Sequence, residues 1–324
     1  MSLPLRQAKS VANGSWPPPG RADHTLTHLL YGRPPLVFDP PSEAVQTSPL
    51  IPGSAALEEL PDGSAEAATV LAPPGALERR HVLAQALRVL RPGGRLDVMA
   101  PKDRGGARLA KELAAFGVAS EVLSKAHHKR CLAVRPEQLV GIEDAIVDTG
   151  PRFDEALGAW TWPGVFAWDR IDPGTALLAE HLPPLKGAGA DLGAGWGALA
   201  TVVLRSPAVT GLRLIELDRR AVEAARRNVE DPRAGLEWAD VRALSDTGDL
   251  DFVVSNPPFH EGGLEDRRLG QGFVRKAAGL LRKGGVAWFV ANRHLPYEAE
   301  LTAAFARLRQ VADQGGYKVL EAVK

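Results

Sequence analysis

The sequence predicts an α/β fold of two tandem domains that arose by duplication of one unit, each a largely parallel sheet with helices beside it. Three observations support this. Short apolar runs alternate with longer amphipathic segments, as in α/β proteins. One strand-helix-strand unit occurs twice along the chain. A glycine-rich turn stands only in the second copy. We therefore expect a degenerate first domain, which kept the fold without the chemistry, and a catalytic second domain.

The repeat consists of two matches that occur in the same order in both copies. Each copy has a strand that stops at two prolines, and each later has an apolar helix end followed by two glycines and another strand. In the first copy Ala72 stands where the second copy has Asn256. The matched segments are 68–74 with 251–258, and 87–94 with 278–285.

The elements follow from periodicity and from the turn residues between them. Residues 1–20 contain a proline run without periodicity, which predicts a flexible N-terminal arm. The first domain, residues 21–136, is expected to contain strands at 36–38, 68–71 and 95–99 and helices at 55–60, 79–90 and 106–116. The second domain, residues 137–324, is expected to contain strands at 145–147, 188–192, 212–215, 235–238, 251–254 and 286–290 and a helix at 198–204.

The composition is that of a globular protein, with 45% hydrophobic and 24% charged residues in 324. A single cysteine, Cys131, excludes an intramolecular disulfide and a cysteine zinc cluster, and we expect no metal site. No apolar leader stands at the N-terminus, so we expect a cytoplasmic protein. No stretch is apolar enough to suggest a membrane partner.

The charge is unevenly distributed although Lys+Arg and Asp+Glu are both 39. Residues 77–135 contain thirteen Lys and Arg against five acids, a net charge of +8. This segment is a candidate surface for a polyanion such as RNA. Its alternative is a solvated helix face that binds nothing. Within it we expect RNA contacts at Arg79, Arg80 and Arg88.

The catalytic turn is predicted where an apolar strand stops at a polar amide. Pro257 and Pro258 cannot continue a β-ladder, so the strand must end at Asn256. The Asn256 side-chain oxygen and the Pro257 carbonyl can both accept hydrogen bonds from one planar NH2 group. Phe259 offers a face on which a flat ring can stack. The turn therefore indicates an exocyclic amine as the substrate group.

A cofactor loop is predicted between the strand at 188–192 and the helix at 198–204. About 20 residues later the next strand ends in Glu216, where a carboxylate can accept both hydroxyls of a ribose. A further strand ends near Asp240, placed to meet an adenine amino group. The same glycines satisfy a dinucleotide fingerprint, but the Asp191 carboxylate would repel a pyrophosphate and attract an ammonium group. The loop glycines are Gly193, Gly195 and Gly197.

The loop 191–197, the acidic strand end Glu216 and the turn 256–259 resemble class I S-adenosylmethionine-dependent methyltransferases that methylate amino groups. More narrowly, the chain resembles the family of ribosomal RNA small-subunit methyltransferase C. That resemblance rests on 163–166, 172–178, 256–260 and Gly262. The chain departs from the family pattern at Asp172-Pro173 and in a short first domain before Ala68.

The resemblance implies two Rossmann-like methyltransferase domains, the first inactive, and S-adenosylmethionine as cofactor. It implies transfer of a methyl group to the 2-amino group of a guanine in 16S ribosomal RNA. Ribosomal RNA or the small ribosomal subunit is the expected partner, and a monomer the expected state. Catalysis is expected from Asn256, Pro257 and Phe259, cofactor binding from Asp191, Gly193, Gly195, Gly197, Glu216, Leu217, Asp240 and Thr175, and a further RNA contact from His260.

Alternative functions remain open on the sequence alone. A similar turn serves methyltransferases that act on another planar amine, such as a guanine of 23S rRNA, an adenine of DNA or a glutamine of a protein. The glycine loop also fits an NAD-dependent oxidoreductase. A third alternative is an RNA-binding module in which both copies are inactive.

Overall fold

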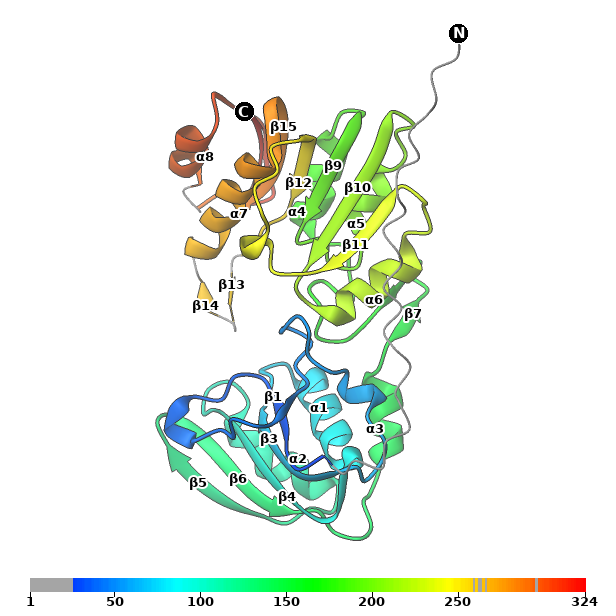
Figure 1. Cartoon of the computed structure of the whole chain (residues 1–324), viewed down its shortest axis with the longest axis vertical. Coiled ribbons are helices and arrows are strands. Elements are labelled where there is room, and N and C mark those ends of the chain that lie inside the picture. The colour runs from blue at the N-terminus through cyan, green and yellow to red at the C-terminus, as the bar shows by residue number, and fades with distance from the viewer. Residues whose placement is uncertain (1–25, 259, 262–263, 266, 295–296) are drawn as a thin grey trace.

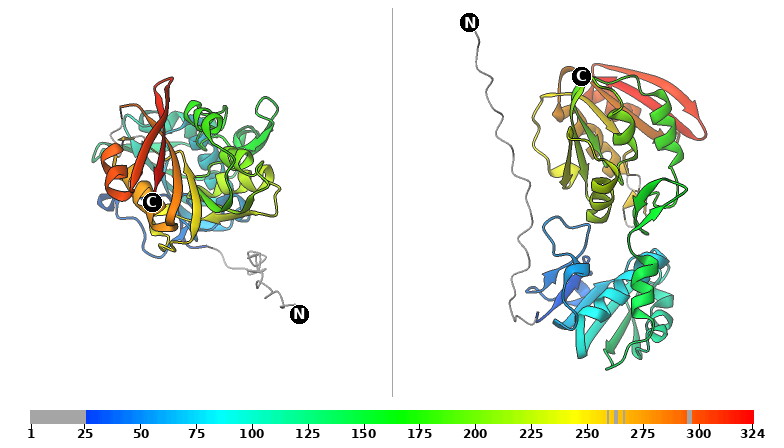
Figure 2. Two further views of the ribbon diagram at one scale, coloured as in Figure 1. Left: turned by 90° about the horizontal axis from the view of Figure 1, so that it is seen from above. Right: turned by 90° about the vertical axis from the view of Figure 1, so that its right-hand side faces the viewer.

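The computed structural model describes residues 26–258, 260–261, 264–265, 267–294 and 297–324. The chain forms two α/β units stacked end to end (Figures 1 and 2). The expected arm, residues 1–20, lies outside the described residues.

The first unit contains a six-stranded sheet in the order β2-β1-β3-β4-β6-β5. Strands β2, β1, β3 and β4 are parallel, and β6 and β5 follow in antiparallel pairings. The strands are β1 (Leu29–Tyr31), β2 (Val45–Gln46), β3 (Ala65–Leu71), β4 (Leu90–Pro101), β5 (Ser120–Lys125) and β6 (His128–Val134). The helices are α1 (Ala76–Val89), α2 (Leu109–Ala115) and α3 (Ile142–Thr149), with 3-10 turns η1 (Leu36–Phe38), η2 (Leu57–Glu59) and η3 (Gly106–Arg108).

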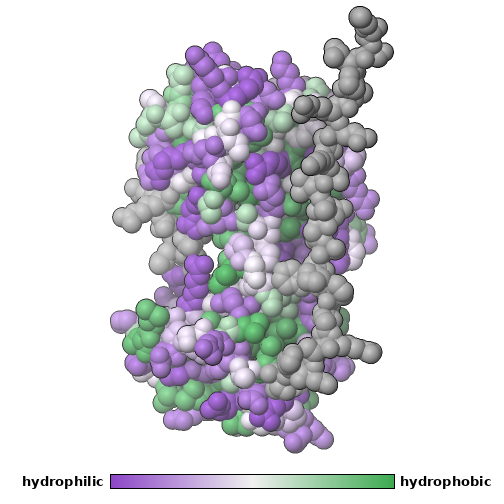
Figure 3. All heavy atoms as spheres, viewed as in Figure 1, coloured by the Kyte–Doolittle hydropathy of each residue, from purple (hydrophilic) through white to green (hydrophobic). Residues whose placement is uncertain are grey.

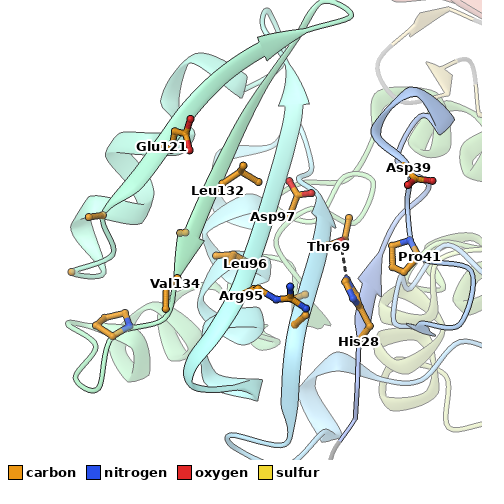
Figure 4. A pocket seen from close by; sticks show the side chains of 16 residues that line it. His28, Asp39, Pro41, Thr69, Arg95, Leu96, Asp97, Glu121, Leu132 and Val134 are labelled. Atoms are coloured by element: carbon orange, nitrogen blue, oxygen red, sulfur yellow. Dashed lines mark hydrogen bonds between the residues drawn. The ribbon is translucent and has the colours of Figure 1, made fainter.

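The first core lies on one face of this sheet. Val70 and Val98 point toward the helices and belong to a single buried apolar cluster. The opposite face carries polar side chains and borders an open cavity of about 830 Å³ (Figure 4). There the ring nitrogen Nε2 of His28 lies 2.9 Å from the Thr69 hydroxyl, beside Asp97. Helices cover both faces of a typical doubly wound sheet, so this unit has one layer fewer within the described residues.

The second unit contains a seven-stranded sheet in the order β11-β10-β9-β12-β15-β17-β16. The first five strands in that order are parallel, and β17 is inserted antiparallel between β15 and β16. The strands are β9 (Gly187–Leu192), β10 (Val209–Glu216), β11 (Ala234–Trp238), β12 (Leu250–Ser255), β15 (Leu281–Asn292), β16 (Arg307–Gln314) and β17 (Tyr317–Val323). The helices are α4 (Pro173–His181), α5 (Ala198–Val203), α6 (Arg219–Asn228), η4 (Val241–Ala243), α7 (Arg267–Leu280) and α8 (Glu298–Ala304), and the hairpins pair β7 (Arg152–Asp154) with β8 (Ala159–Thr161) and β13 (His260–Glu261) with β14 (Leu264–Glu265).

The central strands of the second sheet are covered on both faces (Figure 1). One face packs against α4, α5 and α6 through a cluster that includes Leu178 and Leu199. The other face packs against α7 and α8 through a cluster that includes Phe273 and Leu301. This explains the unbroken apolar run of β12, because a strand buried on both faces has no solvent side for polar residues.

The two sheets share one connectivity. The order β2-β1-β3-β4-β6-β5 repeats the directions and chain sequence of β10-β9-β12-β15-β17-β16, and only the edge strand β11 lacks a counterpart. In this match β3 corresponds to β12 and β4 to β15, the same pairs that the sequence repeat aligns.

Two expected strands are wrong. Residues 145–147 lie in α3, whose buried residues Ile142, Ala145 and Thr149 follow the helical spacing and whose apolar members join the first core. Residues 36–38 form η1, which ends at Asp39 in the left-handed conformation. The β-branched residues of both segments, together with Phe38 in the second of them, favoured strands, but tertiary packing decided otherwise.

The carboxyl ends of the parallel strands in the two sheets face each other (Figure 1). The Pro49 carbonyl, which follows β2, accepts a hydrogen bond from the Arg219 backbone amide at 3.0 Å. It also accepts one from the Trp238 indole nitrogen, at the end of β11, at 3.1 Å. Sites in open α/β sheets lie at this edge, so the first unit is packed directly against the site of the second.

Candidate active site

The three glycines after β9 all have positive φ angles, of +75° for Gly193, +55° for Gly195 and +94° for Gly197. A Cβ on Gly197 would lie 2.7 Å from Cγ2 of Val229. One on Gly193 would lie 3.3 Å from the ring of Phe273. The loop therefore requires glycine for its backbone conformation and for its close packing against neighbouring elements.

The carboxylate of Asp191, at the start of this loop, has an unusual environment. It is fully buried, and neither side-chain oxygen has a hydrogen-bond partner within the described residues. Burial raises the pKa of Asp191 to about 8, and the charge of Glu216 adds to the increase. A buried, unpartnered carboxylate is costly unless a cation meets it. Its position at the glycine loop thus fits a cofactor that carries an ammonium group.

Glu216 ends β10 with its carboxylate directed over the glycine loop. Its oxygens accept hydrogen bonds from the backbone amides of Gly195 and Asp218, both at 2.8 Å. Burial raises the pKa of Glu216, although these two amides oppose the shift. The Leu217 carbonyl accepts a hydrogen bond from the Trp238 indole at 2.8 Å. These contacts fix the backbone beside the carboxylate, as a ribose site requires.

Asp240 lies at the same edge of the sheet but is turned toward a neighbouring cation. Both of its oxygens accept hydrogen bonds from the Arg242 guanidinium, which lowers the pKa of Asp240. Its Oδ1 also caps η4 by accepting from the Arg242 backbone amide at 2.9 Å. An adenine amino group would have to share this carboxylate with Arg242.

The turn that begins at Asn256 lies beside the glycine loop. The hydroxyl of Ser255 donates to the Leu192 carbonyl at 2.6 Å and so joins the ends of β12 and β9. A Cβ on Gly193 would lie 3.9 Å from the Asn256 carbonyl oxygen. The structure thus brings the expected catalytic amide to the expected cofactor loop, with Pro257 buried immediately after it.

The Asn256 side chain is held by two residues at the start of α4. Its Nδ2 donates to Oδ2 of Asp172 at 2.8 Å and to the hydroxyl of Thr175 at 2.9 Å. Thr175, expected as a cofactor contact, therefore contacts the catalytic amide. No role in the site was expected for Asp172, which stands in the segment 172–178 and is the N-cap residue before Pro173.

Two expected site residues cannot be placed. Phe259 lies outside the described residues. His260 belongs to β13, but its side chain is also outside the described part of the structure. Their roles remain predictions.

The expected RNA contacts at Arg79 and Arg88 are wrong. Arg79 is 1% exposed, and its guanidinium binds both carboxylate oxygens of Glu112 and the carbonyls of two prolines. Arg88 donates to the backbone carbonyls of Leu57, Glu58 and Leu60 and pairs with Asp62. Both are structural and present no free guanidinium to a phosphate. Arg80, in contrast, is exposed.

The residues after Glu216 hold the first unit in place, a role that the sequence did not predict. Arg219 pairs with Glu58 at 2.9 Å. Arg220, nearly buried, pairs with Glu78 at 2.9 Å and with Asp218 at 2.7 Å. Because partners 161 residues apart in the chain meet here, no local pattern could reveal them.

Within the described ranges, no group of His, Cys, Asp and Glu is arranged to hold a metal ion. No helix among the same residues combines the length and the apolar character of a membrane span.

Comparisons with known proteins agree with this geometry. Residues 156–321 match the model of the methyltransferase small domain. Ribosomal RNA small subunit methyltransferase C of Pseudomonas paraeruginosa is 32% identical over 288 residues, with 86% of each chain covered. The protein of that name from Ectopseudomonas mendocina is 33% identical over 272 residues, covering 82% of this chain and 81% of its own.

A solved structure is similar over almost the whole chain. The T. thermophilus 16S rRNA N2 G1207 methyltransferase, in complex with AdoMet and guanosine, aligns with a TM-score of 0.76 and 28% identity, covering 92% of this chain and 88% of its own. The match extends across both units and confirms a methyltransferase fold with mixed sheets. The chain therefore belongs to the ribosomal RNA small subunit methyltransferase C family.

Proposed function

We propose that the protein transfers a methyl group from S-adenosylmethionine to the 2-amino group of a guanine in 16S ribosomal RNA. The observation that carries this proposal is the fixed Asn256 amide beside the glycine loop, with a partnerless carboxylate at Asp191. A similar protein is named as a 16S rRNA N2 methyltransferase and was solved with AdoMet and guanosine. The unpartnered Asp191 carboxyl at the glycine loop favours a cofactor with an ammonium group over NAD, because a cation is the partner that the ionised carboxylate needs.

The cofactor, when bound, supplies an electrophilic methyl group. Asp191 would hold its ammonium group and Glu216 its ribose hydroxyls, while the glycines allow the backbone to approach it closely. Leu217 and Asp240 lie at the same strand ends and would border the adenosine.

The chain orients the nucleophile and supplies no covalent intermediate. The Asn256 oxygen and the Pro257 carbonyl would accept the two amine hydrogens, so that the nitrogen lone pair points at the methyl group. Such orientation can lower a barrier by up to ~7–11 kcal/mol. Acceptors at the amine also stabilise the positive charge that develops on the nitrogen. The proton can then leave to water.

The guanine must be unpaired or flipped to reach this turn, because its amino group is otherwise part of the helix. Figure 3 shows hydrophilic residues exposed on both units, which suits contact with a polar nucleic-acid strand. Phe259 is proposed to stack on the base, and His260 to contact the RNA.

The first unit is proposed to be a duplicated methyltransferase domain that has lost its chemistry. Its sheet repeats the connectivity of the second, while Ala72 replaces the catalytic amide. Because α3 packs in the first core, we place the boundary near Gly150 and not at residue 136. We propose that the unit contacts RNA through exposed basic residues, namely Arg80, Lys102, Arg108, Lys111, Lys125 and His127. We further propose a monomer that acts in the cytoplasm on ribosomal RNA or on the small subunit.

Methyl transfer to RNA tests the proposal. Purified protein with labelled S-adenosylmethionine should label unmodified 16S RNA or small subunits, and digestion of the product should yield 2-methylguanosine. Asn256→Ala should lower the single-turnover rate by about a hundredfold or more and leave affinity for S-adenosylhomocysteine nearly unchanged, because the amide acts on the acceptor. Label in 23S RNA, DNA adenine or protein glutamine would contradict the substrate, and binding of NADH alone would contradict the reaction.

A further inference from the structure

We infer that Asp172 and Thr175 are positioning residues that fix the orientation of the Asn256 amide, so that the site accepts only a hydrogen-bond donor from its substrate. The inference rests on the proposed function and adds to it the origin of the preference for an amine. The sequence pattern predicted no contact between either residue and the Asn256 amide.

The hydrogen bonds determine which end of the amide faces the substrate. Nδ2 of Asn256 lies 2.8 Å from Oδ2 of Asp172 and 2.9 Å from the Thr175 hydroxyl oxygen. An ionised carboxylate can only accept, so it must face the NH2 end of the amide. Both partners lie at the NH2 end of the amide. The Asn256 oxygen therefore remains as the acceptor that the side chain offers elsewhere.

A flipped amide is disfavoured by the same contacts. It would place the Asn256 oxygen against the Asp172 carboxylate, where two acceptors would face each other without a proton between them. It would also leave the NH2 group toward the substrate, where it would repel an incoming amine. The observed orientation has a charge-assisted hydrogen bond to Asp172, and the flipped orientation loses it. The Asn256 amide therefore strongly prefers the observed orientation.

The start of α4 is itself held in place, which makes the clamp rigid. Oδ2 of Asp172 caps the helix by accepting from the Thr175 backbone amide at 2.9 Å, with Pro173 in the first turn. Gly174 packs against the Tyr317 ring of β17, where a Cβ would lie only 2.9 Å from a ring carbon. Neither partner of Asn256 can therefore shift without moving the helix.

The chemical consequence is discrimination between groups of similar shape. An exocyclic amine donates to the Asn256 oxygen, whereas a carbonyl at the same position of a purine would meet acceptor against acceptor. Guanine should therefore be bound and xanthine rejected. A site whose buried acceptor is left unpaired by the wrong substrate discriminates far better than one that differs only in size.

Two variants separate positioning from support of the helix. Asp172→Ser keeps an N-cap oxygen but removes the carboxylate that accepts from Nδ2 of Asn256. Thr175→Val keeps the shape of the side chain and removes the acceptor. We expect each to lower kcat by about tenfold or more, with KM for RNA and Kd for S-adenosylhomocysteine within about twofold of the wild type. Thr175→Ser, which restores the hydroxyl, should recover most of kcat.

A double-mutant cycle with Asn256→Ala decides the matter. If Asp172 and Thr175 act through Asn256, their replacement should have little further effect once the amide is gone. Losses that add fully to that of Asn256→Ala, or unchanged kcat in both single variants, would overturn the inference. Should Asp172→Ser fail to fold, the Thr175 cycle gives the same answer. Failure of the wild type to methylate guanine would instead refute the proposed function.

Discussion

Burial without a partner leaves Asp191 protonated in much of the neutral range while the site is free, since its pKa is raised to about 8. In the unfolded chain the ordinary value is 3.8. The folded pKa is therefore the higher one, and the protonated carboxyl stabilises the fold at low pH. That contribution is lost as the pH rises through about 8. A cationic ligand needs the ionised form, so binding must release a proton below this pH.

We predict that affinity for S-adenosylhomocysteine rises with pH toward about 8, by up to about tenfold per pH unit where Asp191 must lose its proton. Asp191→Asn should bind more weakly and lose this dependence. Calorimetric titrations of both proteins between about pH 6 and pH 9 check this. A slope that is the same in wild type and variant would assign the proton to another group, with Glu216 the nearest candidate.

Residues whose role depends on local backbone chemistry were predictable from the sequence. Prolines stop a strand at Asn256, and glycines with positive φ form the loop expected to hold the cofactor, so the strand end and the turn conformation were both predictable. Asp172 was missed because its contact with Asn256 joins residues 84 positions apart. Arg79 was misassigned for a related reason, since a charge pattern does not reveal that Glu112 neutralises it 33 residues later.

At the scale of elements, α1 shows how one helix gives its arginines different functions. Arg79 is buried against Glu112, whereas Arg80, the next residue, is exposed. The helical period separates neighbours by about 100°, which places one on the core side and the other toward solvent. Part of the positive charge of this segment is therefore buried in ion pairs and does not face solvent.

Arg79→Ala should lower the free energy of unfolding by about 3 kcal/mol, because it leaves a largely buried partner unpaired. Arg80→Ala should change it by less than about 0.5 kcal/mol and should instead weaken RNA binding, lowering the salt slope by about 1. Urea denaturation and RNA titrations at several salt concentrations measure both. An unchanged slope for Arg80→Ala would mean that this surface is only solvated.

The five parallel strands of the second sheet and the helix α5 followed from apolar runs, because these strands are central or pack against helices. The helices α4, α6, α7 and α8 and the antiparallel strands β16 and β17 were not predicted. In the first unit β3, β4, α1 and α2 were predicted, and the strands β1, β2, β5 and β6 were not. Its β5-β6 hairpin borders the open face, with β5 largely exposed, so its residues carry no strong apolar signal. Ala126 and His127 in the turn of this hairpin both adopt positive φ, although neither is a glycine. Turns of this kind are usually recognised in a sequence by Asn-Gly or Gly-Gly, and that signal is missing here.

At the scale of the whole molecule, the segment 216–220 serves both units. Glu216 belongs to the candidate cofactor site, and the two following arginines hold the first unit through Glu58 and Glu78. Burial raises the pKa of Glu58, but the His81 ring 3.8 Å away and the charge of Arg219 outweigh this effect and lower the pKa to about 2. The ionised pair should therefore persist across the neutral range.

Glu58→Gln combined with Glu78→Gln should lower the free energy of unfolding by about 2–4 kcal/mol, because two largely buried arginines each lose one ionised partner. Cofactor affinity should fall with it, because the backbone beside Glu216 loses its anchors. Glu66→Gln is the matched control: Glu66 pairs with Arg91 at 3.2 Å, but both side chains are about half exposed, so little change is expected. Equal effects in the double variant and in the control would contradict this view of the interface.

The strand order also determines which of the two sheets is completed first as the chain is synthesised. The first sheet is complete once Val134 has been made, whereas the second lacks β17, which lies between β15 and β16, until residues 317–323 appear. Because N-terminal domains generally fold first as a chain is synthesised, we expect the first unit to be complete while its neighbour is still partial. It can then serve as the surface on which the cofactor edge of the second unit assembles. Tyr317, against which Gly174 of α4 packs, also arrives with that late strand, so the start of α4 lacks this contact until β17 has been made.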